Sequence, residues 1–278
     1  SGMAVTLLRE FRDVLVYDVD EARLGRIVRA GAREGSGAAD VAARCDTVLL
    51  SLPSSPVTER VIRDDVAPAV AEGAIVIDTG TTRVAATREL AGLLADRGAR
   101  LLDAPVSGGS VGTAKGALYC FVGGDRETAA AAWPLLRLLA KARLTYCGPS
   151  GAGQIVKGVN QLAMGLLNAA MVESVAYGVA SGVDQAVLLE AVGGNGGFRS
   201  TFEGVASMIA AGLGDSINYK YTEYDYFLEQ ADSVGFAAPI MRSLKEYLVS
   251  YPHDQIDNIN RAHPSLWGAL IGSKEPDS

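Results

Sequence analysis

The chain has 278 residues, of which 49% are hydrophobic and 21% charged, a balance typical of a globular protein with a buried core. Its formal net charge of −7 argues against a nucleic-acid-binding protein, which would need a basic surface. Cys45, Cys120 and Cys147 lie far apart and indicate unpaired thiols in a reducing compartment, which we expect to be the cytoplasm. With only two histidines, no metal site is expected.

The first half of the chain alternates short apolar runs with helical stretches. Continuous apolar runs of four to six residues favour strands buried on both faces. Their alternation with helices predicts an α/β fold with a mostly parallel, doubly wound sheet over residues 1–150. Strands are predicted at residues 13–20, 46–53, 74–82, 100–109, 117–125 and 143–148, and helices at residues 21–31, 58–70, 85–98 and 126–140.

The second half of the chain has almost no strand pattern. A Gly/Pro/Ser-rich segment at 148–153 marks the change, and an all-helical domain is predicted over residues 151–278, around a long helix at 153–181. Residues 162–180 approach the length of a membrane span, which needs about 20 apolar residues. Because Asn168 and Glu173 interrupt the segment, we interpret it as a buried core helix and expect no membrane partner. The glycine-rich residues 193–201 are predicted to break the later helices.

An acidic residue, Asp18, ends the stretch DVLVYD, residues 13–18, within the first predicted strand. In nucleotide-binding sheets such a residue accepts hydrogen bonds from a ribose and repels a 2′-phosphate, which favours NAD over NADP. An aspartate after a strand is also a common helix N-cap. The strand and GxGxxG turn that would precede Asp18 are not seen in the chain. The opening SGMAVTLLRE is predicted to be the helix that follows such a turn, so a first strand and phosphate loop are expected to be missing.

The stretch LDAPVSGGSVGTAKGAL, residues 102–118, places Ser107, Gly108 and Gly109 directly after an apolar strand. Bare backbone amides and a hydroxyl together can hold a carboxylate. The alternative is an ordinary turn, since Ser, Gly and Gly are common in loops.

A lysine stands in the apolar stretch GAGQIVKGVNQ, residues 151–161. Lys157 and Asn160 are three residues apart and share one helix face, so an amine and an amide can act on the same small ligand. The alternative is a lysine whose apolar stem is buried while its amine reaches water.

Together these motifs resemble the β-hydroxyacid dehydrogenases, the family of 3-hydroxyisobutyrate dehydrogenase, tartronate semialdehyde reductase and 6-phosphogluconate dehydrogenase. The resemblance covers nearly the whole chain and is strongest in DAPVSGGSVGTAKGAL, FVGGD and GPSGAGQIVKGVNQ. It implies a Rossmann domain joined through a long helix to a helical domain. The apolar residues 162–180 suggest association, so we expect a homo-oligomer, either a dimer or a tetramer.

The same resemblance implies roles for individual residues. Lys157 corresponds to the catalytic lysine and Asn160 to the substrate-orienting amide, while Ser107, Gly108 and Gly109 correspond to the carboxylate-binding segment. The contacts on the nicotinamide side of NAD correspond to Leu52, Pro53, Thr79 and Thr81.

Two departures from the family pattern concern the second half. Where the family often has a Lys-Asp pair, this chain has Thr222 and Glu223, and Lys220 is the nearby candidate to replace the lysine. The stretch GGNGGFRSTFE also lacks the usual Ser-Trp pattern, which leaves the substrate open.

The resulting hypothesis is reversible hydride transfer between NAD and a β-hydroxy acid, with neutral Lys157 accepting the hydroxyl proton. A free lysine has a pKa of about 10.4. Desolvation against Ile155, Val156 and Val159 is expected to lower the pKa of Lys157. The alternatives are a relative that reduces C=N bonds or decarboxylates a β-keto acid, and a cofactor-binding scaffold without turnover.

Overall fold

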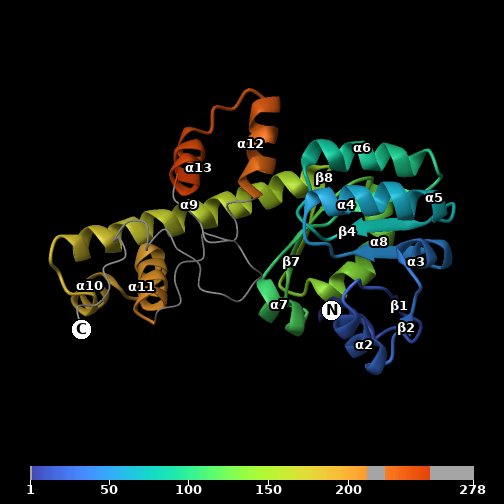
Figure 1. Cartoon of the computed structure of the whole chain (residues 1–278), viewed down its shortest axis with the longest axis horizontal. Helices are drawn as coiled ribbons and strands as arrows, with labels where there is room; N and C mark the ends of the chain where they lie inside the picture. The colour runs from blue at the N-terminus through green and yellow to red at the C-terminus, as the bar shows by residue number, and fades with distance from the viewer. Residues whose placement is uncertain (1, 212–222, 251–278) are drawn as a thin grey trace. The chain divides into compact units, whose positions relative to one another are not determined.

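The structure is a computed structural model, which describes residues 2–211 and 223–250. It divides into two compact units, Ser1–Gly158 and Val159–Ser278 (Figure 1). The division falls inside the long helix α9 (Ala152–Ala180), shortly after the domain boundary proposed at residue 150.

The first unit contains a six-stranded, mostly parallel sheet, as predicted. Its order is β3-β4-β5-β7-β6, with β8 paired to β7. Strands β3, β4 and β5 are parallel, and β7 is antiparallel to β5 and β6 but parallel to β8. The strands are β3 (Thr47–Leu50), β4 (Ile75–Asp78), β5 (Arg100–Asp103), β6 (Val106–Ser107), β7 (Tyr119–Gly123) and β8 (Arg143–Gly148).

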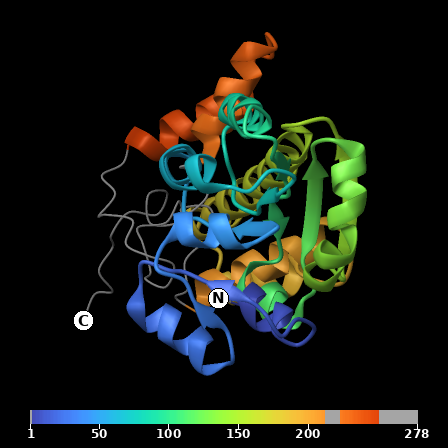
Figure 2. The same cartoon turned by 90° about the vertical axis from the view of Figure 1, so that its right-hand side faces the viewer.

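Helices cover both faces of this sheet, because its strand side chains alternate between two apolar clusters. Val48, Leu50 and Val76 pack on one face against residues of α3, η1, α5 and α6, while Ile77 and Leu102 pack on the other face against α8. The ribbons of these helices lie around the sheet in Figures 1 and 2. The helices of this unit are α1 (Gly2–Leu7), α2 (Glu21–Arg29), α3 (Ala38–Arg44), α4 (Ser55–Val61), the π-helix η1 (Ile62–Val66), α5 (Ala67–Ala69), α6 (Val84–Ala95), α7 (Gly109–Lys115) and α8 (Arg126–Leu139).

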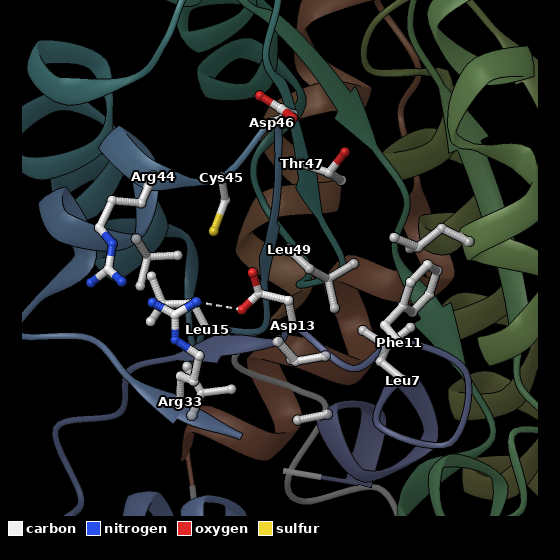
Figure 3. A pocket seen from close by; sticks show the side chains of 15 residues that line it. Leu7, Phe11, Asp13, Leu15, Arg33, Arg44, Cys45, Asp46, Thr47 and Leu49 are labelled. Carbon is white, nitrogen blue, oxygen red and sulfur yellow. Dashed lines mark hydrogen bonds and ion pairs between the residues drawn. The ribbon is translucent and has the colours of Figure 1, made fainter. Parts of the chain in front are cut away.

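A separate two-stranded parallel sheet precedes the main one. It pairs β1 (Leu15–Val16) with β2 (Arg33–Glu34) and is much shorter than the strand predicted at residues 13–20. A cavity of about 550 Å³ lies between β1 and β3 (Figure 3). The Arg33 guanidinium donates to Asp13 across 2.7 Å at this cavity. Among the described residues neither β1 nor β3 has a strand partner on the cavity side, which accounts for the shortness of β1.

The second unit is entirely helical over its described residues. Val172 and Val175 of α9 are fully buried against the shorter helices. The glycine-rich stretch interrupts the helices only between Val192 and Gly197. The shorter helices are α10 (Gln185–Val192), α11 (Gly197–Ala210), α12 (Tyr224–Ser233) and α13 (Pro239–Ser250).

The long helix predicted at residues 153–181 is present as α9, but its predicted burial is wrong in part. By length and hydropathy α9 could span a membrane, yet only 33% of an apolar 18-residue stretch of this helix is buried. Val159, Leu167 and Tyr177 are exposed to 63%, 42% and 77%. The described short helices cover only part of the apolar surface of α9. An apolar sequence therefore did not ensure that the helix is buried within one chain.

Candidate functional site

Two loops at the carboxyl ends of neighbouring parallel strands carry the predicted cofactor-side residues. Leu52 and Pro53 follow β3, and Thr79 and Thr81 follow β4. Carboxyl ends of parallel strands meet at one edge of a sheet, where dinucleotides bind in open α/β folds. Thr79 is buried and its hydroxyl donates to the Leu50 carbonyl at 2.7 Å, so this side chain ties the loop after β4 to the end of β3.

Asp78, the last residue of β4, fixes the loop that follows it. Its buried carboxylate accepts from the Gly80 amide at 2.9 Å and the Thr82 hydroxyl at 2.6 Å. Burial raises the pKa of Asp78 to about 6, against the opposing effect of these hydrogen bonds.

Asp103, the last residue of β5, holds the beginning of α9. Its fully buried carboxylate accepts from the amides of Gly151 at 2.9 Å and Gln154 at 3.1 Å. These amides have no partner within the helix, and the positive end of the helix dipole favours an anion there. Burial nevertheless raises the pKa of Asp103 to about 6. A Cβ at Gly123 would lie 2.6 Å from the Asp103 carboxylate, so only glycine permits this close packing.

Lys157 lies about one turn beyond Gln154 on α9 and is buried, with 7% of its surface exposed. Its amine, Nζ, donates to the Val106 carbonyl at 2.8 Å. The predicted desolvation of the amine is wrong for two of its three residues, because Ile155 is 37% exposed and Val159 is 63% exposed, whereas Val156 is half-buried. Residues two positions away on a helix point to the opposite side, so these two could not cover the amine.

The predicted carboxylate-binding segment begins next to the residue that Lys157 contacts. Val106 and Ser107 form β6, and Gly108 and Gly109 lead into α7. Both glycines have positive φ angles, 132° and 61°, which side chains with a Cβ rarely adopt. Ser107 is half-buried and the two glycines are exposed. The structure therefore brings the Lys157 amine to the strand that carries this segment.

Asn160 follows Lys157 by three residues on α9 and is half-buried. Its amide donates to the Gln161 side chain at 3.3 Å. The shared helix face predicted from the spacing is thus occupied by a buried amine and a more accessible amide.

Asp18 lies in the turn after β1 and is not brought into contact with the other candidates by any described hydrogen bond. Its carboxylate accepts from the Asp20 amide at 2.9 Å. Asp20, and not Asp18, caps α2 by accepting from the Arg23 amide. The N-cap alternative for Asp18 is therefore wrong. Lys220 and Thr222 lie outside the described residues.

Sequence reasoning missed Gln154, which is 1% exposed. Its Nε2 donates to the Gly80 carbonyl at 3.0 Å, and its Oε1 accepts from the Thr82 amide at 3.1 Å. The available signal was an amide one turn before the candidate lysine on the same helix. Asp78 and Asp103 were also missed, although each ends an apolar strand, where a buried carboxylate can hold turn amides.

Comparisons with known proteins bear on the family, the fold and the cofactor of this chain. Residues 1–148 match the family described as the NAD binding domain of 6-phosphogluconate dehydrogenase. The structure resembles that of the 3-hydroxyisobutyrate dehydrogenase of Mycobacterium tuberculosis with L-serine, with a TM-score of 0.82 and 23% identity, over 99% of this chain and 95% of that one. The predictions of the Rossmann-type fold with a helical second half, and of NAD as the cofactor, are confirmed.

Two curated relatives come from Pseudomonas aeruginosa. An NAD-dependent L-serine dehydrogenase is 34% identical over 192 residues, which are 68% of this chain and 64% of that protein. A 3-hydroxyisobutyrate dehydrogenase is 34% identical over 199 residues, which are 69% of this chain and 66% of that protein. The matched region is thus just under two thirds of each relative.

Proposed function

The chain belongs to the β-hydroxyacid dehydrogenase family, and we propose that it transfers a hydride between NAD and a small β-hydroxy acid similar to 3-hydroxyisobutyrate. The observation that carries the proposal is the buried amine of Lys157, hydrogen-bonded to the strand that leads into Ser107, Gly108 and Gly109. This arrangement sets a group able to move a proton beside a segment able to hold a carboxylate.

The residues at the sheet edge fit NAD. An acidic side chain after β1 suits a ribose diol, and the loops after β3 and β4 lie where a parallel sheet receives a dinucleotide. A Cβ at Gly80 would lie 3.1 Å from the Asp78 carboxylate and 3.3 Å from the Leu52 carbonyl, so the loop is tightly packed at this glycine. The glycine turn that would hold the diphosphate is not among the described residues. We propose that Asp18 holds the ribose and that Leu52, Pro53, Thr79 and Thr81 line the nicotinamide side.

Bound NAD supplies the hydride acceptor, and the chain's own residues handle the proton and the substrate. In the oxidative direction neutral Lys157 accepts the proton of the substrate hydroxyl, and in the reductive direction its ammonium returns it. Burial works against the charged form of an amine, whereas the Val106 carbonyl acceptor supports it. These opposing influences suit a group that must exist in both forms during one cycle.

The substrate carboxylate is assigned to Ser107, Gly108 and Gly109, whose backbone amides and hydroxyl can donate to its oxygens. Asn160 is assigned to the substrate hydroxyl, beside Lys157 along α9. A ligand held by this segment beside the Lys157 amine would expose its carbinol carbon in a fixed orientation, which is the main requirement for hydride transfer.

We further propose a cytoplasmic homo-oligomer with two domains, residues 1–150 for NAD and residues 151–278 for substrate and association. Support for association comes from the exposed apolar residues of α9, since surface patches of this kind commonly mark interfaces. A second copy that covers these residues would also explain why a dehydrogenase has an apolar helix of nearly membrane-spanning length.

The test is a panel assay that follows NADH absorbance. 3-Hydroxyisobutyrate and L-serine are supplied with NAD, and a cyclic imine and a β-keto acid test the alternative reactions. Reduction of NAD by a β-hydroxy acid is expected, with the corresponding β-oxo acid as the first product. Imine reduction, or CO₂ release from the β-keto acid, with no oxidation of hydroxy acids would contradict the proposal. NAD binding without any turnover would favour the scaffold alternative.

A further inference from the structure

The first turns of α9 connect three of the candidate segments through buried polar contacts. The Gly151 and Gln154 amides bind Asp103, the Gln154 side chain binds the loop at Gly80–Thr82, and Lys157 binds Val106. All these contacts lie within the first compact unit. A shift of this short helical segment would therefore move the lysine and the cofactor-side loop together.

Gln154 occupies a position whose two loop partners require opposite hydrogen-bonding groups. The Thr82 amide needs an acceptor, and the Gly80 carbonyl needs a donor. A carboxamide supplies both from one planar group, whereas a carboxylate supplies acceptors only. With Gln154 fully buried, a missing partner would not be replaced by water, and the loop would lose a fixed position.

We propose that Gln154 is a positioning residue, whose carboxamide holds the loop at Gly80–Thr82 in register with the Lys157 amine. This inference rests on the proposed function. Asp78 fixes the loop to its own strand through the Gly80 amide and the Thr82 hydroxyl. Gln154 fixes the opposite groups, the Gly80 carbonyl and the Thr82 amide, to the helix of the lysine. Only the second set connects the cofactor side with the group that moves the proton.

Two substitutions separate positioning from simple stabilisation. Gln154→Met keeps an unbranched side chain of similar length but removes both hydrogen bonds. Gln154→Glu keeps the acceptor for Thr82 and loses the donor to Gly80 whenever it is ionised. Protonation would restore a donor, because a carboxylic acid offers both groups.

In steady-state assays with NAD and the hydroxy acid, Gln154→Met is expected to lower kcat about 10- to 100-fold, because misplacement of reacting groups by about 1 Å has effects of that size. Its deuterium isotope effect, measured with substrate labelled at the carbinol carbon, should rise as hydride transfer becomes rate-limiting. For Gln154→Glu, the ratio of its kcat to the wild-type kcat at the same pH should rise as the pH falls. That ratio should stay flat for Gln154→Met.

Gln185→Met is the matched control, since Gln185 is half-buried and also donates to a backbone carbonyl, that of Ala206. It should lower stability without changing the isotope effect or the pH dependence of the kcat ratio. If Gln154→Met also loses activity only in proportion to the folded fraction, with an unchanged isotope effect, the positioning role is wrong.

Hydrogen exchange gives a readout that does not depend on turnover. The Thr82 amide should exchange faster in Gln154→Met than in the wild type, because it loses its acceptor. Unchanged exchange overturns the positioning role even in an active enzyme. Suppose that the wild type oxidises no hydroxy acid, while the Thr82 amide still exchanges faster in Gln154→Met than in the wild type. The loop contact has then been detected, and the proposed function alone is overturned.

Discussion

Helix α9 has two regions that reverse the usual distribution of polar and apolar side chains. Near its beginning, Gln154 and Lys157 are buried to more than nine-tenths. Farther along, Leu167 is 42% exposed and Tyr177 is 77% exposed. Lysine is almost never fully buried without a partner, whereas large apolar side chains usually are buried.

The difference indicates two separate constraints on one helix. Each buried polar group at the beginning has a specific partner on a strand or a loop of the first unit. The apolar residues farther along have no comparable cover among the described residues. Val159 and Tyr177 are 18 residues apart, five full turns at 3.6 residues per turn, so they lie on the same side of the helix. The proposed function assigns the first region to chemistry and the second to association.

The strongest test of this division is Lys157→Ala. Loss of a general acid and base typically lowers kcat about 10²- to 10⁴-fold. NAD affinity, measured by calorimetry, should be retained because the cofactor-side loops are held by other residues. Lys141→Ala, at an exposed lysine, is the control and should keep wild-type activity. A Lys157→Ala variant with near-native kcat would remove the chemical role from this region of α9.

The association side of the comparison is tested by Leu167→Asp. An unpaired carboxylate buried at an interface costs about 3 kcal/mol or more, roughly a 100-fold weaker association. Sedimentation velocity should then show smaller species at concentrations where the wild type is associated. Val234→Asp, at an exposed apolar residue outside α9, should leave the assembly intact. An unchanged distribution for Leu167→Asp would place the interface elsewhere.

Sequence patterns predicted what depends on local periodicity. The alternation of apolar runs and helices predicted the strands β3, β4, β5, β7 and β8 and the extent of α9, because burial on two faces leaves a continuous apolar run. They did not predict β2, since Arg33 and Glu34 are polar and exposed, nor α3 and α7, which are short and rich in small residues.

The site was predicted as far as residue type revealed chemistry. Lys157 and the Ser107–Gly109 segment carry recognisable groups, and the structure brings them to adjacent positions. Gln154, Asp78 and Asp103 were missed because, apart from the Thr82 hydroxyl that Asp78 accepts from, their partners described above are backbone groups 2 to 74 residues away in sequence. A backbone amide has no letter of its own in a sequence, so these hydrogen bonds become visible only in the fold.

A smaller effect is expected from Asp103, which anchors the polar region of α9. The pKa of its carboxyl is raised from the usual 3.8 to about 6 by burial. Between these values the native protein keeps a proton that the unfolded chain has lost, so the free energy of unfolding should fall as the pH rises from about 4 to about 6. Asp78 acts in the same direction, with a pKa of about 6.

Asp103→Asn cannot ionise and should remove the contribution of Asp103 to that fall. It should also lower stability by about 1–3 kcal/mol, because one backbone amide loses its acceptor. Urea unfolding at several pH values measures both effects, and Asp64→Asn is a control at an exposed carboxyl. A slope between pH 4 and 6 that is identical in wild type and Asp103→Asn would contradict the assignment.

The smallest effect concerns Asp18, which lies outside α9 and acts on cofactor choice only. Its carboxylate accepts from the Asp20 amide, and that turn holds it after β1, where a dinucleotide ribose is expected. Two unit charges about 4 Å apart in water interact by roughly 1 kcal/mol. Replacing Asp18 with serine should therefore raise the ratio of kcat/KM for NADP to that for NAD by about fivefold.

Serine keeps an oxygen that can accept from the Asp20 amide, so the turn should persist. Asp20→Ser removes a carboxylate two residues away, at the cap of α2, and should leave the cofactor ratio unchanged. If both variants have the wild-type ratio, Asp18 shapes only the turn, and the ribose must be held by another group.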